Sequence, residues 1–102
     1  MSKLSEKEAL VLELLIERGP SYGLALVDAS EGALKRGTVY VTLGRMEEKG
    51  LVEVLRDPSP EQHSGMARPR YRASPMGARA LAAQRAFQMV WASPTAKLRG
   101  AR

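Results

Sequence analysis

The sequence predicts a mainly α-helical fold with a small β-hairpin, formed by one small domain and a C-terminal helix. Three observations lead to this prediction: the chain has 102 residues, apolar residues recur at helical spacing in most of it, and two short alternating segments enclose a polar loop. A chain of this length forms a single domain with one small core. The 44% of hydrophobic and 26% of charged residues are typical of a folded globular protein.

The first helix is expected from Ser5 to about Arg18. Ser5 and Glu8 have the spacing of a capping box, and Gly19-Pro20 ends the helix because proline cannot continue it. The helix is apolar around most of its circumference, through Ala9, Leu10, Val11, Leu12, Leu14, Leu15 and Ile16. Such a helix must be covered on more than one side, and in so short a chain we expect the second cover to come from another subunit.

A second helix follows a short extended connector at residues 21–23. It is expected from about Leu24 to Ser30. The residues expected to face inward are Leu24, Ala25 and Val27.

The third helix is expected from about Gly37 to Lys49, with Gly50 as the residue that caps its C-terminal end. Its buried face is predicted from residues at i, i+4 and i+7, which are Val39, Leu43 and Met46. The remaining faces carry Thr38, Val41, Thr42 and Arg45.

A β-hairpin is expected after the third helix. Residues 51–56 alternate between apolar and polar side chains as a strand does, and residues 68–73 form the returning strand. The loop between them, residues 57–67, is rich in Pro, Ser, Gly and Gln. Pro69 is expected at the first residue or at an edge of the second strand, where its missing amide hydrogen is tolerated.

The fourth helix begins with Ser74 as its N-cap and Pro75 in its first turn, and it is expected to end near Trp91. One side of it carries the apolar side chains of Met76, Ala80, Ala83, Phe87 and Val90. The predicted organisation is a domain of three helices and a hairpin at residues 1–73, a C-terminal helix at 74–92 and a flexible basic tail at 93–102.

Positive charge is concentrated in the second half of the chain, although the net charge is only +5. Residues 1–34 hold three basic and six acidic side chains, and residues 35–72 hold eight basic and five acidic ones. Residues 73–102 hold five basic side chains and no acidic one. This asymmetry predicts a polyanionic partner, with a merely solubilising surface as the alternative.

The sequence offers no convincing catalytic or metal site, so we expect neither an enzyme nor a cofactor. It contains no Cys, which excludes disulfides, thiol nucleophiles and zinc-thiolate sites. Its single His, His63, lies in the predicted loop beside Asp57 and Glu61, and is interpreted as a surface residue with a DNA contact as the alternative. Residues 19–23 match the G-x-S-x-G pattern by letter, but a helix rather than a strand precedes them.

Membrane segments and signal peptides are not expected either. The apolar stretch at residues 9–12 is far too short to span a membrane. Charged residues follow the first four residues too closely for a signal peptide. A cytoplasmic protein without membrane contact is therefore the expectation.

The order of helix, helix, helix, hairpin and helix is that of a winged helix-turn-helix domain, in which the hairpin is the wing. Lys35 and Arg36 stand just before the third helix, where free amides and cationic side chains together attract phosphate. From the same helix, Thr38, Thr42 and Arg45 are expected to reach base edges in the major groove of double-stranded DNA.

Arginines at alternate positions are expected to line one face of the second wing strand. They are Arg68, Arg70 and Arg72, of which the first two are assigned to DNA binding. A charged solvent face is the alternative interpretation of these arginines.

The fourth helix is expected to form a homodimer together with the first. Both helices carry more apolar surface than one small domain can cover, and monomers seldom expose large apolar patches. Packing two copies with two-fold symmetry buries both faces and sets the recognition helices about one DNA turn, roughly 34 Å, apart. The predicted interface consists of Leu10, Leu14, Met76, Ala80, Ala83, Phe87, Val90 and Trp91.

Three segments make the chain resemble the PadR-type transcriptional regulators over roughly residues 5–90. Residues 14–23, LLIERGPSYG, are similar to the end of the family's first helix and its Gly-Pro-x-x-Gly connector. Residues 37–52, GTVYVTLGRMEEKGLV, resemble the recognition helix and its entry into the wing. Residues 70–79, RYRASPMGAR, resemble the second wing strand and the start of the last helix.

The resemblance implies a homodimeric repressor of the family's short branch, which binds a palindromic operator, often in its own promoter, and responds to a small molecule or stress. In that family the tyrosine matching Tyr40 contacts the DNA backbone, and residues matching Thr38 and Arg45 lie at the DNA face. The resemblance implies that some short members bind flat aromatic compounds between their last helices. Trp91 is interpreted as an ordinary dimer contact, with a planar aromatic effector stacked on it as the alternative. Val41 stands where the family usually has proline.

The sequence thus predicts a DNA-binding transcriptional regulator that acts through its third helix and its wing. The alternative is a dimeric protein-interaction adaptor that keeps the fold and has lost DNA binding. Salt-dependent binding to duplex DNA distinguishes the two.

Overall fold

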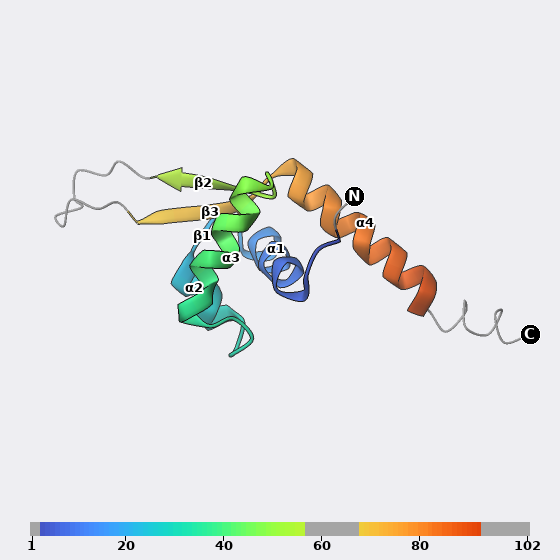
Figure 1. Cartoon of the computed structure of the whole chain (residues 1–102), viewed down its shortest axis with the longest axis horizontal. Coiled ribbons are helices and arrows are strands. Elements are labelled where there is room, and N and C mark those ends of the chain that lie inside the picture. The colour runs from blue at the N-terminus through green and yellow to red at the C-terminus, as the bar shows by residue number, and fades with distance from the viewer. Residues whose placement is uncertain (1–2, 57–67, 93–102) are drawn as a thin grey trace, which may run out of the picture.

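The structure is mainly helical with a small three-stranded antiparallel sheet, which confirms the predicted fold class. The computed structural model describes residues 3–56 and 68–92, with side chains as far as residue 89. In chain order the elements are α1 (Glu6–Arg18), β1 (Ser21–Tyr22), α2 (Gly23–Ala29), α3 (Arg36–Glu48), β2 (Val52–Arg56), β3 (Pro69–Ala73) and α4 (Pro75–Ala92). Figure 1 shows α1 between the other helices, with the strands leaving the body on one side and α4 on the other.

The first helix begins and ends where its local sequence predicts. Ser5 Oγ accepts a hydrogen bond from the Glu8 amide at 3.1 Å, and Glu8 Oε1 accepts one from the Ser5 amide at 3.0 Å, which completes the capping box. At the other end Gly19 has a φ of 85°, which glycine adopts without strain. Its amide donates to the Leu15 carbonyl at 2.8 Å.

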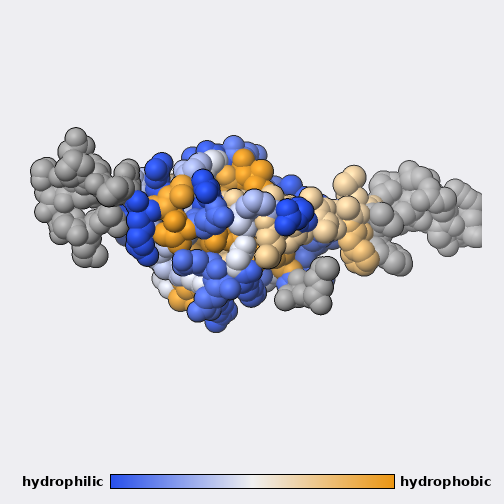
Figure 2. Space-filling view, turned by 90° about the horizontal axis from the view of Figure 1, so that it is seen from above, coloured by the Kyte–Doolittle hydropathy of each residue, from blue (hydrophilic) through white to orange (hydrophobic). Residues whose placement is uncertain are grey.

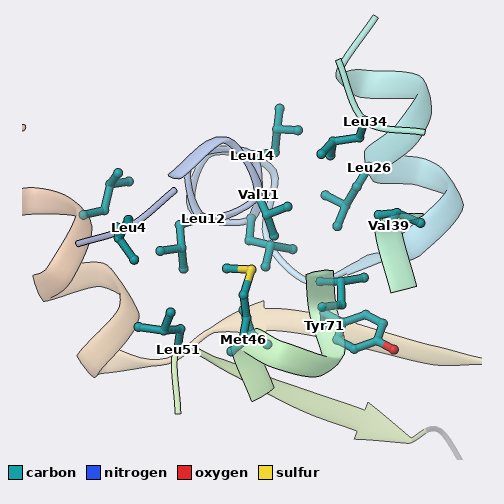
Figure 3. Packing of buried hydrophobic residues seen from close by; sticks show 14 residues of the cluster. Leu4, Val11, Leu12, Leu14, Leu26, Leu34, Val39, Met46, Leu51 and Tyr71 are labelled. Atoms are coloured by element: carbon teal, nitrogen blue, oxygen red, sulfur yellow. The ribbon is translucent and has the colours of Figure 1, made fainter. Parts of the chain in front are cut away.

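The hydrophobic core lies between α1 and the elements packed around it (Figure 3). Val11 and Leu12 of α1 are fully buried. The predicted inner face of α3, made of Val39, Leu43 and Met46, is fully buried as well. Helical spacing over about two turns therefore identified this face correctly.

The inner face of α2 differs from the prediction. Leu26 is fully buried, although the sequence did not predict it to face inward. Of the three residues predicted to face inward, Val27 is half-buried and packs against the core, whereas Leu24 and Ala25 are half-buried without belonging to it. The helix has seven residues and begins at Gly23, one residue earlier than predicted. A helix this short has little stability of its own, so packing by its neighbours decides which of its sides is covered.

The sheet has one strand more than the predicted hairpin. β2 and β3 pair antiparallel as predicted, and β1 pairs with β3, so that the strand order is β1-β3-β2. The two residues of β1, Ser21 and Tyr22, lie opposite Tyr71 and Arg70 of β3. Because Ser21 and Tyr71 are buried, Tyr22 and Arg70 share the outer face of the sheet. Pro69 begins β3, as predicted.

The first turn of α4 is tied to the segment that joins α3 to β2. Ser74 donates its amide to the Leu51 carbonyl at 3.0 Å and its hydroxyl to the Gly50 carbonyl. As the predicted N-cap, its oxygen also accepts from the Gly77 amide at 2.9 Å. Gly77 is so close to Leu51 that a Cβ atom on this glycine would overlap the Leu51 carbonyl oxygen. Further along, Leu81 is buried in the core, so the first half of α4 belongs to the body of the protein.

Candidate nucleic-acid interface

The N-terminal end of α3 combines free backbone amides with cationic side chains. Lys35 is the N-cap residue, and no side chain of the described residues caps this end. Lys35 and Arg36 are both exposed. Unpaired amides, the positive end of the helix dipole and two cations together favour an anion here. Thr38 and Arg45, which are also exposed, extend the polar surface along the helix.

The centre of the open face of α3 differs from what the sequence predicts. Thr42 is half-buried and, with Arg45, lines a groove against the first turn of α1. The residue opposite the buried face is Val41, which is two positions from Val39 and therefore about 200° around the helix. Val41 is 55% exposed. The prediction did not assign Val41 to DNA, although its spacing from Val39 already placed it on the open side.

Tyr40 is positioned by α2 as well as by α3. A Cβ atom on Gly23 would lie 2.6 Å from Cε1 of the Tyr40 ring, so the ring rests directly on the backbone of α2. Tyr40 is nevertheless 46% exposed, beside the open face of α3.

Burial, with smaller contributions from Tyr40 and Glu47, raises the pKa of Tyr71, so this buried phenol remains uncharged.

An ion pair fixes the C-terminal end of α3 to α1. Lys49 Nζ lies 2.7 Å from Glu8 Oε2, and the Glu8 side chain is almost completely buried. Burial raises the pKa of Glu8, but the hydrogen bonds from Lys49 and Ser5 outweigh it and leave that pKa below its ordinary value of 4.5. One carboxylate therefore caps α1 and also sets the direction of α3.

The outer face of the wing carries a cluster of aromatic and basic side chains. The guanidinium carbon of Arg68 lies 5.7 Å from the centre of the Tyr22 ring, which is a cation–π distance. Arg70 is opposite Tyr22, and its Nε is buried with no hydrogen-bond partner among the described residues. Arg72 Nε, in contrast, lies 2.7 Å from Glu53 Oε1. The three arginines therefore differ in how far their charge is already compensated.

The predicted dimer residues fall into three groups. Those buried in, or packed against, the core of their own chain are Leu10, Leu14 and Ala80. Those exposed on α4 are Met76, Ala83 and Phe87. Those whose side chains lie outside the described part of the chain are Val90 and Trp91.

Gln84 and Arg85 hold the middle of α4 to its own chain through polar contacts. The Leu4 amide donates to Gln84 Oε1 at 2.9 Å, and Arg85 Nη2 lies 2.7 Å from Glu13 Oε2. The described side chains beyond these contacts, at residues 86–89, are all exposed. Figure 2 shows this outer part of α4 mostly in hydrophobic shades.

The alternative sites considered in the sequence have ordinary structural explanations or lie outside the described residues. Ser21 is buried, and its hydroxyl donates to the Gly19 carbonyl at 2.9 Å, so it stabilises the turn between α1 and β1. Among residues 3–56 and 68–92, no group of three His, Cys, Asp or Glu residues is placed to hold a metal ion. His63 lies outside the described part of the chain. Within the described residues, no helix is long and apolar enough to cross a membrane.

The chain is similar to several proteins of known structure. It is 32% identical to a PadR family transcriptional regulator from Eggerthella lenta, with 90% of this chain and 80% of that chain covered and a TM-score of 0.70. It is 26% identical to a PadR family regulator from Clostridium difficile, with 92% and 98% covered and a TM-score of 0.73.

More distant similarity shows a shared fold alone. The PcaV transcriptional regulator from Streptomyces coelicolor, whose structure is in complex with its natural ligand, is 21% identical, with 91% of this chain and 64% of that chain covered and a TM-score of 0.67. No curated protein matches the chain. The model of the transcriptional regulator PadR-like family, however, matches residues 11–83. The chain therefore belongs to the PadR-like family of transcriptional regulators, which are DNA-binding proteins with a winged helix-turn-helix fold and not enzymes.

Proposed function

We propose that the chain is a homodimeric repressor that binds a palindromic DNA site through α3 and the wing. The observation that carries this proposal is the asymmetry of α3, one side of which is fully buried while Arg36, Thr38 and Arg45 are exposed around the other. A helix held on one side and open on the other fits the major groove, whose width admits one α-helix. The amides and cations at its N-terminal end are suited to the phosphates beside that groove.

The wing provides the second DNA contact in this proposal. Arg70 lies opposite Tyr22 on this face, and its Nε has no hydrogen-bond partner among the described residues. The half-buried guanidinium group of Arg70 can form charge-assisted hydrogen bonds with a phosphate oxygen through its terminal nitrogens. Arg68 adds a second cation next to Arg70 on the same face of the sheet. Arg72 is expected to contribute least because Glu53 already compensates its charge.

We propose that α4 forms the dimer. Leu4, Ala80, Ala83 and Phe87 line an open and mostly apolar groove of about 510 Å³ along this helix. Phe87 itself is 63% exposed. The α4 helix of a second copy is the occupant that suits this groove, because a closed two-fold arrangement buries the same apolar surface on both chains. Such a dimer would place the two α3 helices about one DNA turn apart.

The repressor role and the cytoplasmic location belong to the same proposal. A dimer bound to a palindromic site in a promoter prevents RNA polymerase from binding that stretch of DNA. The regulator must also share a compartment with the DNA that it binds. A reporter gene behind the recovered binding site is expected to be less active when the protein is present, and increased activity would contradict repression.

DNA binding is tested by measuring the affinity for a duplex, recovered from a random pool, over a range of salt concentrations. If the dimer neutralises about six to ten phosphates, its affinity should fall by roughly 10³ to 10⁵ between 50 and 200 mM salt. Arg70→Ala should flatten the salt dependence, whereas the matched control Arg72→Ala, in the same strand, should change it less. A wild-type affinity that does not respond to salt would overturn the proposal and favour the adaptor.

The dimer is tested by sedimentation of the Phe87→Ala variant. Loss of a buried Phe costs about 3 to 5 kcal/mol, and a two-fold interface contains the change twice, so this variant should shift toward monomer. Met89→Ala is the matched control because Met89 is 70% exposed on α4 but lies about 200° around the helix from Phe87. A wild-type protein that remains monomeric at micromolar concentration would exclude this dimer.

A planar aromatic effector is the remaining part of the proposal. Trp91 is the single tryptophan of the chain, so its fluorescence reports binding near the end of α4 without interference. The distant relative PcaV has a natural ligand, which supports a search for one. Quenching by a planar aromatic compound is the expected result. No quenching across a broad panel would leave an ordinary dimer contact as the role of Trp91.

A further inference from the structure

The middle of the open face of α3 is occupied by a single apolar side chain. Val41 is 55% exposed and lies opposite the buried face of the helix. Gly37 and Gly44 lie on the same face, about one turn to either side of it. A Cβ atom added to either glycine would have no atom of its surroundings within 4 Å. The isopropyl group of Val41 therefore projects further from the helix than the glycines one turn before and after it.

Helix stability does not account for these three residues. Valine is a poorer helix former than alanine or the long unbranched residues, because its branched Cβ restricts the side chain in a helix. Glycine weakens a helix interior further through its larger conformational entropy in the unfolded chain. Neither Gly37 nor Gly44 is required by a positive φ or by a close neighbour among the described residues. Folding alone would favour Ala, Glu or Lys at all three positions.

We infer that Val41 reads the 5-methyl group of a thymine in the major groove, an inference that rests on the proposed DNA binding. Val41 has no side-chain donor or acceptor, so it can distinguish base pairs only by apolar contact. Among the groups that base pairs present in the major groove, the thymine methyl is the apolar one. Lys35 and Arg36, exposed at the N-terminal end of the same helix, supply the attraction to phosphate that brings the duplex onto this face.

The two glycines strengthen the inference because they allow close approach. A side chain longer than valine at either position would hold the helix away from the floor of the groove. With only hydrogen atoms there, the helix can lie deep enough for a short side chain to touch a base edge. Thr38 and Arg45 flank this contact, and both side chains are exposed.

The test replaces thymidine by deoxyuridine, one position at a time and in both half-sites, in the duplex recovered with the wild-type protein. This exchange removes only the methyl group and leaves base pairing unchanged. At one position the exchange should weaken binding by about fourfold when it is made in one half-site and by about 16-fold when it is made in both. Each half-site then loses the burial of one apolar carbon. Val41→Ala should bind the thymine duplex as weakly as the wild type binds the uracil duplex, and should not respond to the exchange.

Ile16→Ala is the matched control for Val41→Ala. Ile16 is a branched aliphatic residue on α1 with a similar exposure of 51%, so its removal should leave the response to deoxyuridine unchanged. If the wild type binds with salt dependence but tolerates deoxyuridine everywhere, or if Val41→Ala keeps the wild-type response, the inference is wrong and the proposed DNA binding stands. If the wild type does not bind duplex DNA at all, both are wrong.

Discussion

The close approach of α4 to the start of the wing depends on Gly77, and replacing it by alanine tests how tightly the two are packed. A Cβ atom at this position would overlap the Leu51 carbonyl oxygen and would lie 2.9 Å from Cδ2 of Leu12. The Leu12 side chain can rotate, but Leu51 contributes a backbone atom that cannot move without shifting the strand. Its carbonyl also accepts the hydrogen bond from the Ser74 amide, which fixes it further. In Gly77→Ala, α4 must therefore move away from the core.

Gly77→Ala is expected to destabilise the protein, whereas an ordinary Gly→Ala change in a helix stabilises it. Alanine alone would stabilise a helix by about 0.5–1 kcal/mol, whereas overpacking costs about 1–3 kcal/mol and more when backbone must shift. We expect a net loss of about 1–3 kcal/mol, which lowers the melting temperature of a domain of this size by roughly 5–20 °C. Thermal unfolding followed by circular dichroism measures this shift.

Gly44→Ala is the matched control, because a Cβ atom at this helical glycine would meet no atom of its surroundings within 4 Å. It should stabilise the protein by about 0.5–1 kcal/mol and raise the melting temperature by a few degrees. The reasoning would be refuted if Gly77→Ala melted at or above the wild-type temperature. If both variants melted at a lower temperature than the wild type, the gain in helix propensity expected at Gly44 would be wrong, while the explanation from the Leu51 contact would stand.

Three further predictions follow from single contacts. Gly23→Ala should displace the Tyr40 ring, which the resemblance to the family implies as a contact to the DNA backbone, and should therefore weaken duplex binding by about tenfold, the effect of losing one hydrogen bond to phosphate; an unchanged affinity in a filter-binding assay would contradict it. Leu81→Ala should cost about 2–5 kcal/mol in urea unfolding because Leu81 is almost fully buried, and a cost below about 1 kcal/mol would contradict its place in the core. The pKa of Glu8 is lowered in the folded state, so its contribution to stability is present above its ordinary pKa of 4.5 and is lost as the pH falls. Glu8→Gln should therefore be less stable than wild type at about pH 7, and the difference in unfolding free energy should shrink at about pH 3; a constant difference would exclude the ion pair with Lys49 as its cause.

The local sequence by itself determined the helices, the hairpin and most of their ends. Ser5 and Ser74 are N-caps whose hydrogen-bond partners, the amides of Glu8 and Gly77, are three residues away, so the local sequence alone reveals them. The buried face of α3 recurs over about two turns, long enough for the period to be clear. The basic and hydroxyl residues on the rest of α3 could be assigned to DNA for the same reason.

Only the tertiary structure decided the features that join distant segments. β1 has two residues and becomes a strand only by pairing with β3, so no local pattern marks it. Two further contacts depend in the same way on how α1, α2 and α3 pack. They are the ion pair between Glu8 and Lys49 and the contact of the Tyr40 ring with Gly23.

The same distinction separates the parts of the candidate site. Sequence spacing shows which residues of α3 share a side, but the neighbouring elements decide which of those sides remains open. Thr42 is half-buried because α1 begins beside it, and Val41 becomes the centre of the open face. The physical reason is that a helix period is a property of one segment, whereas exposure is a property of everything packed around it.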